Sequence, residues 1–158
     1  MEIEKDTLKK LINIRLATEK DKLQIVELSK EWENENSTYG FYADELDYIN
    51  ENRCFVAHIE DTVIAYLFGK VFESKQMKSI MPEGTLYFEL EEIYVTPKYR
   101  NYGIGSMLFD YLENILKDEK ITQMVLSTAT KDYESIFNFY IKRKGMSFWS
   151  ARLFKEIK

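Results

Sequence analysis

A strand pattern, a pair of glycines and a helix pattern follow one another directly in the middle of this chain. The strand pattern runs from Leu86 to Val95, and Gly103-Ile104-Gly105 precede apolar residues that repeat at helical spacing up to Leu116. The glycines let the backbone approach a ligand closely, and the unpaired N–H groups of a first helical turn attract an anion. With Arg100 adding a positive charge, the segment predicts a phosphate or pyrophosphate site built largely from main chain.

The spacing narrows the choice of phosphate motif. The segment that begins at Gly103 does not match the dinucleotide-binding motif G-x-G-x-x-G, because Leu108 occupies the position of the third glycine. It also lacks the Gly-Lys-Ser/Thr of a P-loop. An isolated glycine pair more often makes only a tight turn, so the pair by itself leaves that alternative open.

The remaining periodicities predict one α/β domain, residues 1–158, with a sheet of mixed direction. Helices are expected from Thr18 onward and at 43–49, 107–116 and 133–144, and a mobile loop at 73–84. Strands are expected at 12–16, 54–59, 62–71, 86–95 and 121–126, with a last strand or hairpin at 148–157.

Composition excludes several classes of protein. Lys and Arg total 22 against 27 Asp and Glu, a net charge of −5, which disfavours nucleic acid as a partner. No apolar run approaches the length of a membrane helix, and Met1 to Lys10 lacks an apolar signal core, so we expect a cytoplasmic protein and no membrane partner. Cys54 and His58 are the only Cys and His, which argues against zinc, and no metal cofactor is predicted. About 13 Å would separate them on one strand, too far for a nucleophile and its base, so both are interpreted as structural.

Several motifs together resemble one family. Arg100-Asn101-Tyr102-Gly103-Ile104-Gly105 matches the Arg/Gln-x-x-Gly-x-Gly/Ala signature of GNAT acetyltransferases. The similarity covers about residues 12–155 and extends to the segments 15–18 with Asp21, 93–99, 136–140 and Gly145-Met146. Within the family, residues 91–106 and the tail 150–155 are most similar to spermidine/spermine (diamine) acetyltransferases.

The resemblance implies a single GNAT-like domain with about six to seven strands and about four helices, and acetyl-CoA as co-substrate. It places the CoA pyrophosphate on the N–H groups of residues 101–106 and the pantetheine along the edge of residues 93–95. The implied cofactor-binding residues are Ile93, Tyr94, Val95, Arg100, Asn101, Tyr102, Gly103, Ile104, Gly105 and Ser106. Family members often carry a CoA-contacting Asn where this chain has Tyr133, so that contact is not expected from the family pattern.

Acetyl transfer to an amine needs a base, because an alkylammonium is charged at pH 7. Glu89, Glu91 and Glu92 are the candidates, and their alternative interpretation is a set of solvated or ion-paired carboxylates. If side chains alternated strictly along the strand, Glu89 and Glu91 would lie on one face and Glu92 on the other. The family usually has a β-bulge in this strand, which would change that assignment. The resemblance makes Tyr140 the acid that protonates the departing CoA thiolate. Without the resemblance, Tyr140 would be a core aromatic on an amphipathic helix.

The acceptor is predicted to be a small cationic, polyamine-like primary amine. Residues 31–52 hold seven acids and no Lys or Arg, a run that would suit a cation or would simply be a solvated face: Glu31, Glu33, Glu35, Asp44, Glu45, Asp47 and Glu51. A protein N-terminus, a Lys side chain or an amino sugar are alternative acceptors, and a non-catalytic acyl-CoA-binding domain is the alternative from another class. Dimers are common among look-alikes, so a homodimer is a candidate assembly.

Overall fold

A five-stranded mixed sheet forms the centre of the protein. The computed structural model describes residues 5–157. The strands lie in sequence order: β1 (Asn13–Leu16), β2 (Arg53–Ile59), β3 (Thr62–Glu73), β4 (Leu86–Val95) and β5 (Gln123–Leu126). Neighbouring strands are antiparallel except β4 and β5, which are parallel. The α/β class, the mixed direction and these five strands are as the sequence predicted.

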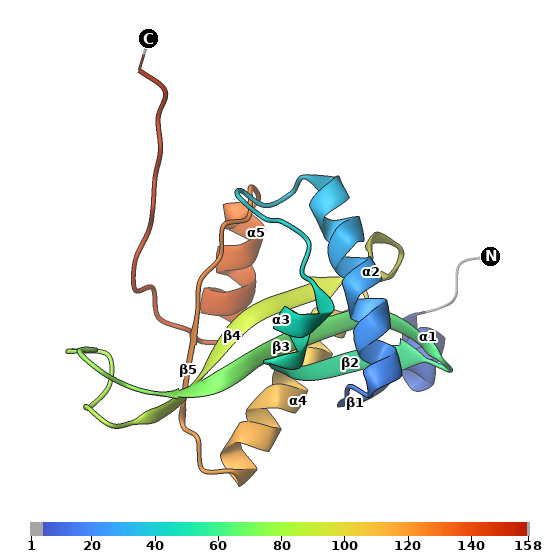
Figure 1. Ribbon diagram of the computed structural model, residues 1–158, viewed down its shortest axis with the longest axis horizontal. Helices are drawn as coiled ribbons and strands as arrows, with labels where there is room; N and C mark the ends of the chain where they lie inside the picture. Colours follow the sequence, from blue (N-terminus) through green and yellow to red (C-terminus); the bar gives the residue numbers. More distant parts are fainter. Residues whose placement is uncertain (1–4, 158) are drawn as a thin grey trace.

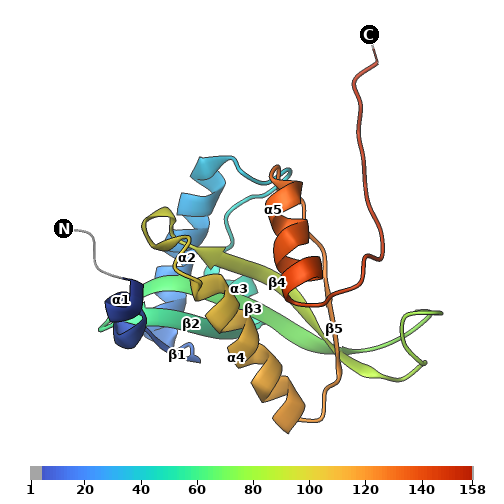
Figure 2. The ribbon, with the colours of Figure 1, turned by 180° about the vertical axis from the view of Figure 1, so that it is seen from behind.

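Helices cover both faces of the sheet. Helices α2 (Glu19–Glu35) and α3 (Leu46–Asn50) pack on one face, around Ile25, Ile49, Tyr66 and Phe68. On the other face lie α1 (Lys5–Leu11), α4 (Ile104–Asp118), α5 (Tyr133–Phe137) and η2 (Asn138–Arg143), and Figures 1 and 2 show the two layers. A short 3₁₀ turn, η1 (Pro97–Tyr99), follows β4. The predicted helix at 133–144 thus begins as an α-helix and continues as a π-helix that carries Tyr140.

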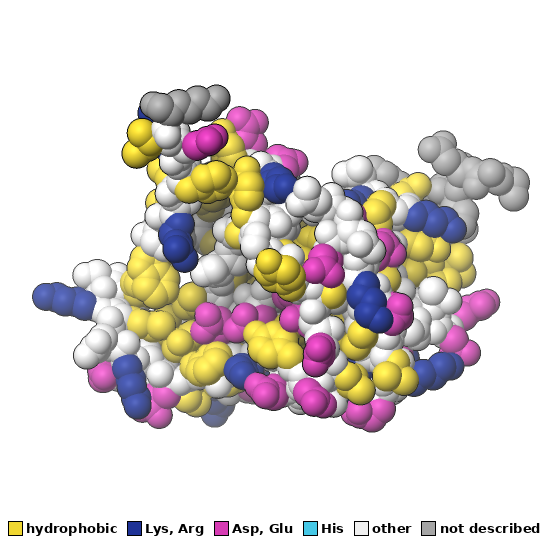
Figure 3. All heavy atoms as spheres, turned by 45° about the horizontal axis from the view of Figure 1, so that its top comes forward, with side chains coloured by type: hydrophobic (Ala, Val, Ile, Leu, Met, Phe, Trp, Pro, Cys, Tyr) yellow, Lys and Arg dark blue, Asp and Glu magenta, His cyan; other side chains and the backbone are white. Residues whose placement is uncertain are grey.

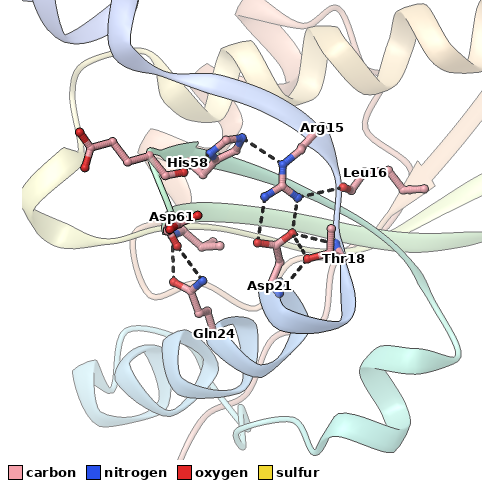
Figure 4. A network of polar contacts seen from close by, with 9 residues as sticks. Arg15, Leu16, Thr18, Asp21, Gln24, His58 and Asp61 are labelled. Carbon is pink, nitrogen blue, oxygen red and sulfur yellow. Dashed lines mark hydrogen bonds and ion pairs between the residues drawn. The ribbon is translucent and has the colours of Figure 1, made fainter.

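Helix α2 starts where the sequence predicts, at a capping box. The Thr18 side chain accepts from the Asp21 backbone N–H, and the Asp21 carboxylate accepts from the Thr18 backbone N–H at 2.7 Å. Arg15 on β1 also binds Asp21, and its Nε donates to His58 Nε2 at 3.1 Å (Figure 4). These contacts tie β1, β2 and α2 together, so His58 has a structural role, as expected.

Two stretches differ from the sequence prediction. Helix α1 was not predicted, because residues 5–11 are mostly charged, yet its Leu8 is buried against the core. The strand or hairpin expected at 148–157 is wrong: these residues have no regular secondary structure in the described chain. A strand needs a partner, and residues 147–157 form no hydrogen bond with the described residues. The sheet therefore has five strands rather than six or seven, and five α-helices accompany it rather than about four.

Candidate active site

The site lies where β4 and β5 stop pairing. The four residues of β5 pair with Tyr87 to Leu90, and β4 then continues for five residues, Glu91 to Val95, beyond the last pair. On its other side β4 remains bonded to β3 over this stretch. The backbone of residues 91–95 therefore offers an unpaired edge, to which an extended amide-containing ligand can bind as an added strand.

The glycine loop connects this edge to α4. Asn101 and Gly103 both adopt the left-handed conformation, with φ of 66° and 83°, and Gly103 is the N-cap of α4 without any side-chain cap. The first N–H groups of the fifteen-residue helix are consequently left for an external acceptor. A Cβ added at Gly105 would meet its nearest atom, Val95 Cγ2, at 3.8 Å, so the protein itself has room for a side chain there. This geometry fits a diphosphate bound by main-chain N–H groups.

Within the predicted cofactor-binding segment the side chains have different roles. Ile104 is buried, and Ile93, Val95 and Tyr102 pack against the same core cluster as α4. Only their backbone groups are in a position to bind a ligand. Tyr94 points to the opposite face, where its hydroxyl oxygen lies within hydrogen-bond distance of Glu31 Oε1, at 2.9 Å, and of Glu35 Oε1.

Arg100 is held by the protein itself. Its Nε donates to the Val95 carbonyl at 2.9 Å, and its Nη2 binds Glu35 Oε1 and Oε2 at 2.7 and 2.9 Å. The guanidinium also lies over the Tyr94 ring, 5.3 Å from its centroid. Arg100, which the sequence analysis expects beside a phosphate, is therefore already paired with the Glu35 carboxylate of α2.

A β-bulge brings the three candidate carboxylates together. Phe68 pairs with Glu92 and Gly69 pairs with Leu90, so Glu91 is the extra residue on β4. The bulge shifts the alternation by one residue, and Glu89 and Glu92 consequently face the same side of the sheet. Tyr94, on the same side as Glu92, packs in the cluster under α2 and α3. The expectation that a bulge would break strict alternation is confirmed.

Glu92 has the most perturbed environment of the three. Burial, reinforced by the neighbouring Asp44 carboxyl, raises the pKa of Glu92 to about 9, although the Tyr66 hydroxyl donates to Glu92 Oε2 at 2.8 Å and acts in the opposite direction. The pKa of Glu89 is also raised, by burial and by the nearby Glu91, while Lys70 opposes that rise. Such a carboxyl can exchange a proton near neutral pH once a cation lies beside it.

Tyr140 approaches from the other side of β4. Its ring is buried in the α4-side cluster, 6.1 Å from the Phe109 ring centroid, and its hydroxyl makes no hydrogen bond to the described residues. Burial raises the pKa of Tyr140, so the phenol stays protonated at neutral pH. The phenol therefore remains a candidate proton donor at neutral pH.

The acidic run divides into two groups. Asp44 lies beside Glu92; its carboxylate accepts from the Ser29 hydroxyl at 3.3 Å, and its backbone N–H donates to the same oxygen at 2.8 Å. Glu31 and Glu35 contact the Tyr94 hydroxyl. The others are exposed on the surface, and Glu51 pairs with Lys70 at 3.6 Å. Figure 3 shows acidic side chains at the floor of a hollow, between the side that carries the C-terminal segment and the side that carries α2.

The loop after α2 closes over this region. Tyr39 N–H donates to the Ala129 carbonyl at 2.9 Å, and Lys131 N–H donates to the Ser37 carbonyl at 2.9 Å. The segment that follows β5 is thereby joined to the acid-bearing side of the molecule. Among the aromatic residues of this region, Trp32 stacks on Phe41 and Tyr94, whereas Tyr39 and Tyr42 are exposed.

Other predicted features have structural or unassigned roles. Cys54 is buried, and burial raises the pKa of its thiol to about 12, so it is not a nucleophile at neutral pH. Tyr133, at the position of the family's Asn, is mostly exposed, and its ring contacts the ring of Phe137 edge-on. Asp132 is the N-cap of α5. Residues 5–157 contain no cluster of three potential metal ligands. No helix among them has the length and apolarity to span a bilayer.

Sequence reasoning did not point to Tyr66, and it named Asp44 only as one of the seven acids of the acidic run. Tyr66 lies in an apolar strand and Asp44 in a short acidic stretch, and neither position carries a local signal. Only the pairing of β3 with β4 brings Tyr66 to Glu92. Asp44 is held nearby through hydrogen bonds with Ser29 of α2. The one available signal was a tyrosine within an apolar strand pattern, because a buried tyrosine needs a hydrogen-bond partner for its hydroxyl.

A parallel strand pair that opens and a glycine loop at the start of a helix together form an arrangement that fits a cofactor with a diphosphate group. Residues 21–146 match the model of the acetyltransferase (GNAT) family. The chain belongs to this family and is an N-acetyltransferase; members of the family use acetyl-CoA as acetyl donor.

Relatives and solved structures agree with this assignment. The chain is 29% identical to an N-alpha-acetyltransferase of Sulfolobus acidocaldarius over 153 residues, which cover 88% of this chain and 86% of the relative. An aminoglycoside acetyltransferase from an uncultured soil metagenomic sample has a TM-score of 0.71 at 15% identity and covers 96% and 99% of the two chains. A predicted acetyltransferase of Clostridium acetobutylicum, solved with acetyl-CoA, has a TM-score of 0.65 at 18% identity and covers 93% and 96%.

Proposed function

We propose that this enzyme transfers the acetyl group of acetyl-CoA directly to the primary amine of a small, polyamine-like cation. The observation that carries the proposal is the partly buried Glu92–Asp44–Tyr66 group at the point where β4 and β5 separate. The acetyl thioester supplies the electrophile. The CoA diphosphate would lie on the N–H groups of residues 101–106 beside Arg100, and the pantetheine along residues 93–95.

In this proposal Glu92 is the base. A bound ammonium favours the ionised carboxylate, so it would bring the pKa of Glu92 down from about 9 toward neutrality. The carboxylate then takes one proton from the ammonium, directly or through water, and the neutral amine attacks the thioester carbonyl. Glu89 and Glu91, on the same stretch of β4, are assigned to binding the charged acceptor rather than to the proton transfer.

Tyr140 would supply the proton that the leaving thiolate needs. Its hydroxyl has no protein partner in the described chain, and burial keeps the phenol protonated. Glu92 faces α2 and Tyr140 lies with the α4-side cluster, so the base and the acid approach the opening of the sheet from opposite faces. This arrangement separates the incoming amine from the departing thiol.

The acids around the hollow support a cationic acceptor. Asp44, Glu91 and Glu92 lie within one electrostatically coupled group, to which Tyr48 also belongs. A polycation would be favoured there over a neutral or anionic amine. The similarity to an N-alpha-acetyltransferase supports a second candidate acceptor, the N-terminus of a protein.

A panel of acceptors assayed with acetyl-CoA by thiol release tests the proposal. We expect spermidine and spermine to be acetylated with a higher kcat/KM than a monoamine of similar length or a peptide with a free N-terminus. Glu92→Gln should lower kcat, whereas Glu91→Gln should mainly raise KM for the polyamine. Preferential acetylation of the peptide would replace the polyamine by a protein N-terminus.

A further inference from the structure

Arg100 lies in an exposed loop, yet the protein holds its guanidinium in one orientation. Its Nε donates to the Val95 carbonyl at 2.9 Å, and its Nη2 donates to both carboxylate oxygens of Glu35, at 2.7 and 2.9 Å. Its Cζ lies 5.3 Å from the centroid of the Tyr94 ring. The third nitrogen, Nη1, donates to no other residue within 5–157. The side chain is thus fixed through two nitrogens and leaves the third for a ligand.

Glu35 is itself held in place at the end of α2. Its Oε1 lies within hydrogen-bond distance of the Tyr94 hydroxyl, and its side chain is 18% exposed, against 41% for that of Arg100. Burial, together with the carboxylates of Glu35 and Glu31, raises the pKa of Tyr94, so this hydroxyl stays protonated at neutral pH. One turn earlier on α2, Trp32 stacks on Tyr94 with the ring centroids 5.3 Å apart. The Glu35 carboxylate is therefore a rigid anchor for a cation.

The fold has little need of the Glu35–Arg100 pair for its stability. An ion pair with an exposed partner contributes little to the free energy of unfolding. The end of α2 is already attached to β4 by the Trp32–Tyr94 stack and by Glu31, whose Oε1 lies 2.9 Å from the Tyr94 hydroxyl. The pair instead restricts Arg100, because a long side chain on a loop otherwise samples many rotamers. This restriction indicates a role in ligand binding rather than in folding.

We propose that Glu35 is a positioning residue, which holds Arg100 so that its Nη1 binds the diphosphate of acetyl-CoA. This role deepens the proposed function and rests on the placement of the diphosphate beside Arg100. An arginine that is already ordered loses less side-chain entropy when it binds a phosphate group. The carboxylate also has an opposing effect, because its negative charge lowers the positive potential at the loop. In this proposal the ordering outweighs the charge, so Glu35 strengthens the binding of the donor.

Isothermal titration calorimetry of the full chain with CoA measures this effect without any turnover. We expect Glu35→Gln to weaken CoA binding roughly tenfold, which is the affinity that ordering one long side chain is worth. Glu119→Gln is the matched control, because Glu119, the C-cap of α4, binds Arg53 through both carboxylate oxygens at 2.6 and 2.7 Å. Its CoA affinity should equal that of the unmodified protein. An unchanged affinity in Glu35→Gln would overturn the proposal, and a tighter one would mean that Glu35 competes with the diphosphate for Arg100.

A donor without a diphosphate distinguishes positioning from a general structural role. S-acetylpantetheine carries the acetyl thioester and the pantetheine arm, but no diphosphate. With this donor and the same amine acceptor, Glu35→Gln and the unmodified protein should have equal kcat/KM. With acetyl-CoA the variant should have a KM that is raised roughly tenfold and a nearly unchanged kcat. An equal loss with both donors would mean that Glu35 only supports the surrounding fold, and the positioning role would be wrong.

Arg100→Gln separates the positioning role from the donor placement on which it rests. This variant should weaken CoA binding at least as much as Glu35→Gln does. The double variant should bind CoA no more weakly than Arg100→Gln alone, because Glu35 acts only through Arg100. An unchanged CoA affinity in Arg100→Gln would refute the placement of the diphosphate and the positioning role together. Weaker binding in Arg100→Gln with unchanged binding in Glu35→Gln would refute the positioning role alone.

Discussion

Replacing Glu92 with Gln should stabilise the protein while it impairs catalysis. Burial beside Asp44 raises the pKa of Glu92 from 4.5 to about 9, so the folded protein favours the neutral carboxyl. A group with a raised folded-state pKa gives its full stabilising contribution below the unfolded pKa, about 4.5 here, and loses it as the pH rises toward 9. Gln keeps the neutral shape and an oxygen that can accept from Tyr66 but never ionises.

The size of the effect follows from the shift. Between the unfolded pKa of 4.5 and the folded pKa of about 9, each pH unit lowers the free energy of unfolding of the unmodified protein by about 1.4 kcal/mol. At pH 7 the Gln variant should therefore be more stable than the unmodified protein by up to about 3 kcal/mol. The difference between the two proteins should grow by a similar amount between pH 5.5 and pH 7.5, roughly two units of the same slope.

Urea unfolding at these two pH values measures the difference directly. Glu33→Gln, at an exposed residue of the same acidic run, is the control and should show no comparable change with pH. Activity of the Glu92→Gln variant should fall, because an amide cannot take the proton from the acceptor ammonium. A stability difference that does not vary with pH would refute the raised pKa and, with it, the physical case for Glu92 as the base.

Four further predictions test other parts of the structure. Tyr140→Phe should lower kcat by roughly 10²–10⁴-fold with little change in stability, since it removes only a hydroxyl without a protein partner; near-normal turnover would leave Tyr140 a core aromatic. Gly105→Val should keep the fold, because the protein has room there, but abolish the rise in melting temperature with acetyl-CoA; an unchanged rise would remove the diphosphate from this loop. Despite burial, Arg15 and Thr18 lower the pKa of Asp21 to about 2, so its stabilisation of about 2 kcal/mol is present above pH 4 and lost as the pH falls toward 2; Asp21→Asn should lose it at neutral pH in urea unfolding. The KM for spermine should rise with ionic strength more steeply than that for a monoamine, and equal slopes would mean that the acids do not attract the substrate.

Local signals predicted the strands and helices well. The glycine pair with its left-handed Asn101 and Gly103, the Thr18 capping box and the end of β4 at Pro97 are all short-range features, fixed by backbone sterics and by bonds between residues a few positions apart. Helix α4 likewise follows from its apolar spacing. The family resemblance, which depends on the same short motifs, is confirmed by the match over residues 21–146.

The arrangement of the candidate site could be predicted only in part. The sequence named three glutamates but could not choose among them, because the choice depends on which strand lies beside β4 and on a bulge at Glu91. It assigned Arg100 to phosphate alone, although Glu35, sixty-five positions away, binds the guanidinium. Its failure at residues 148–157 has the same origin: a strand pattern states what a segment can form, and a partner decides whether it does.

The sequence by itself therefore determined the local conformations of the strands, turns and helices, and it supplied the candidate anion-binding loop and the candidate groups for acetyl transfer. Tertiary structure alone decided that Asp44, Tyr66 and Glu92 meet in one partly buried group, which raises the pKa of Glu92 far above that of an isolated glutamate. It also decided that β4 and β5 separate after four pairs and leave an edge on each. The physical reason is range: caps, turns and periodicity act within a few residues, whereas desolvation and charge coupling depend on what the whole fold packs together.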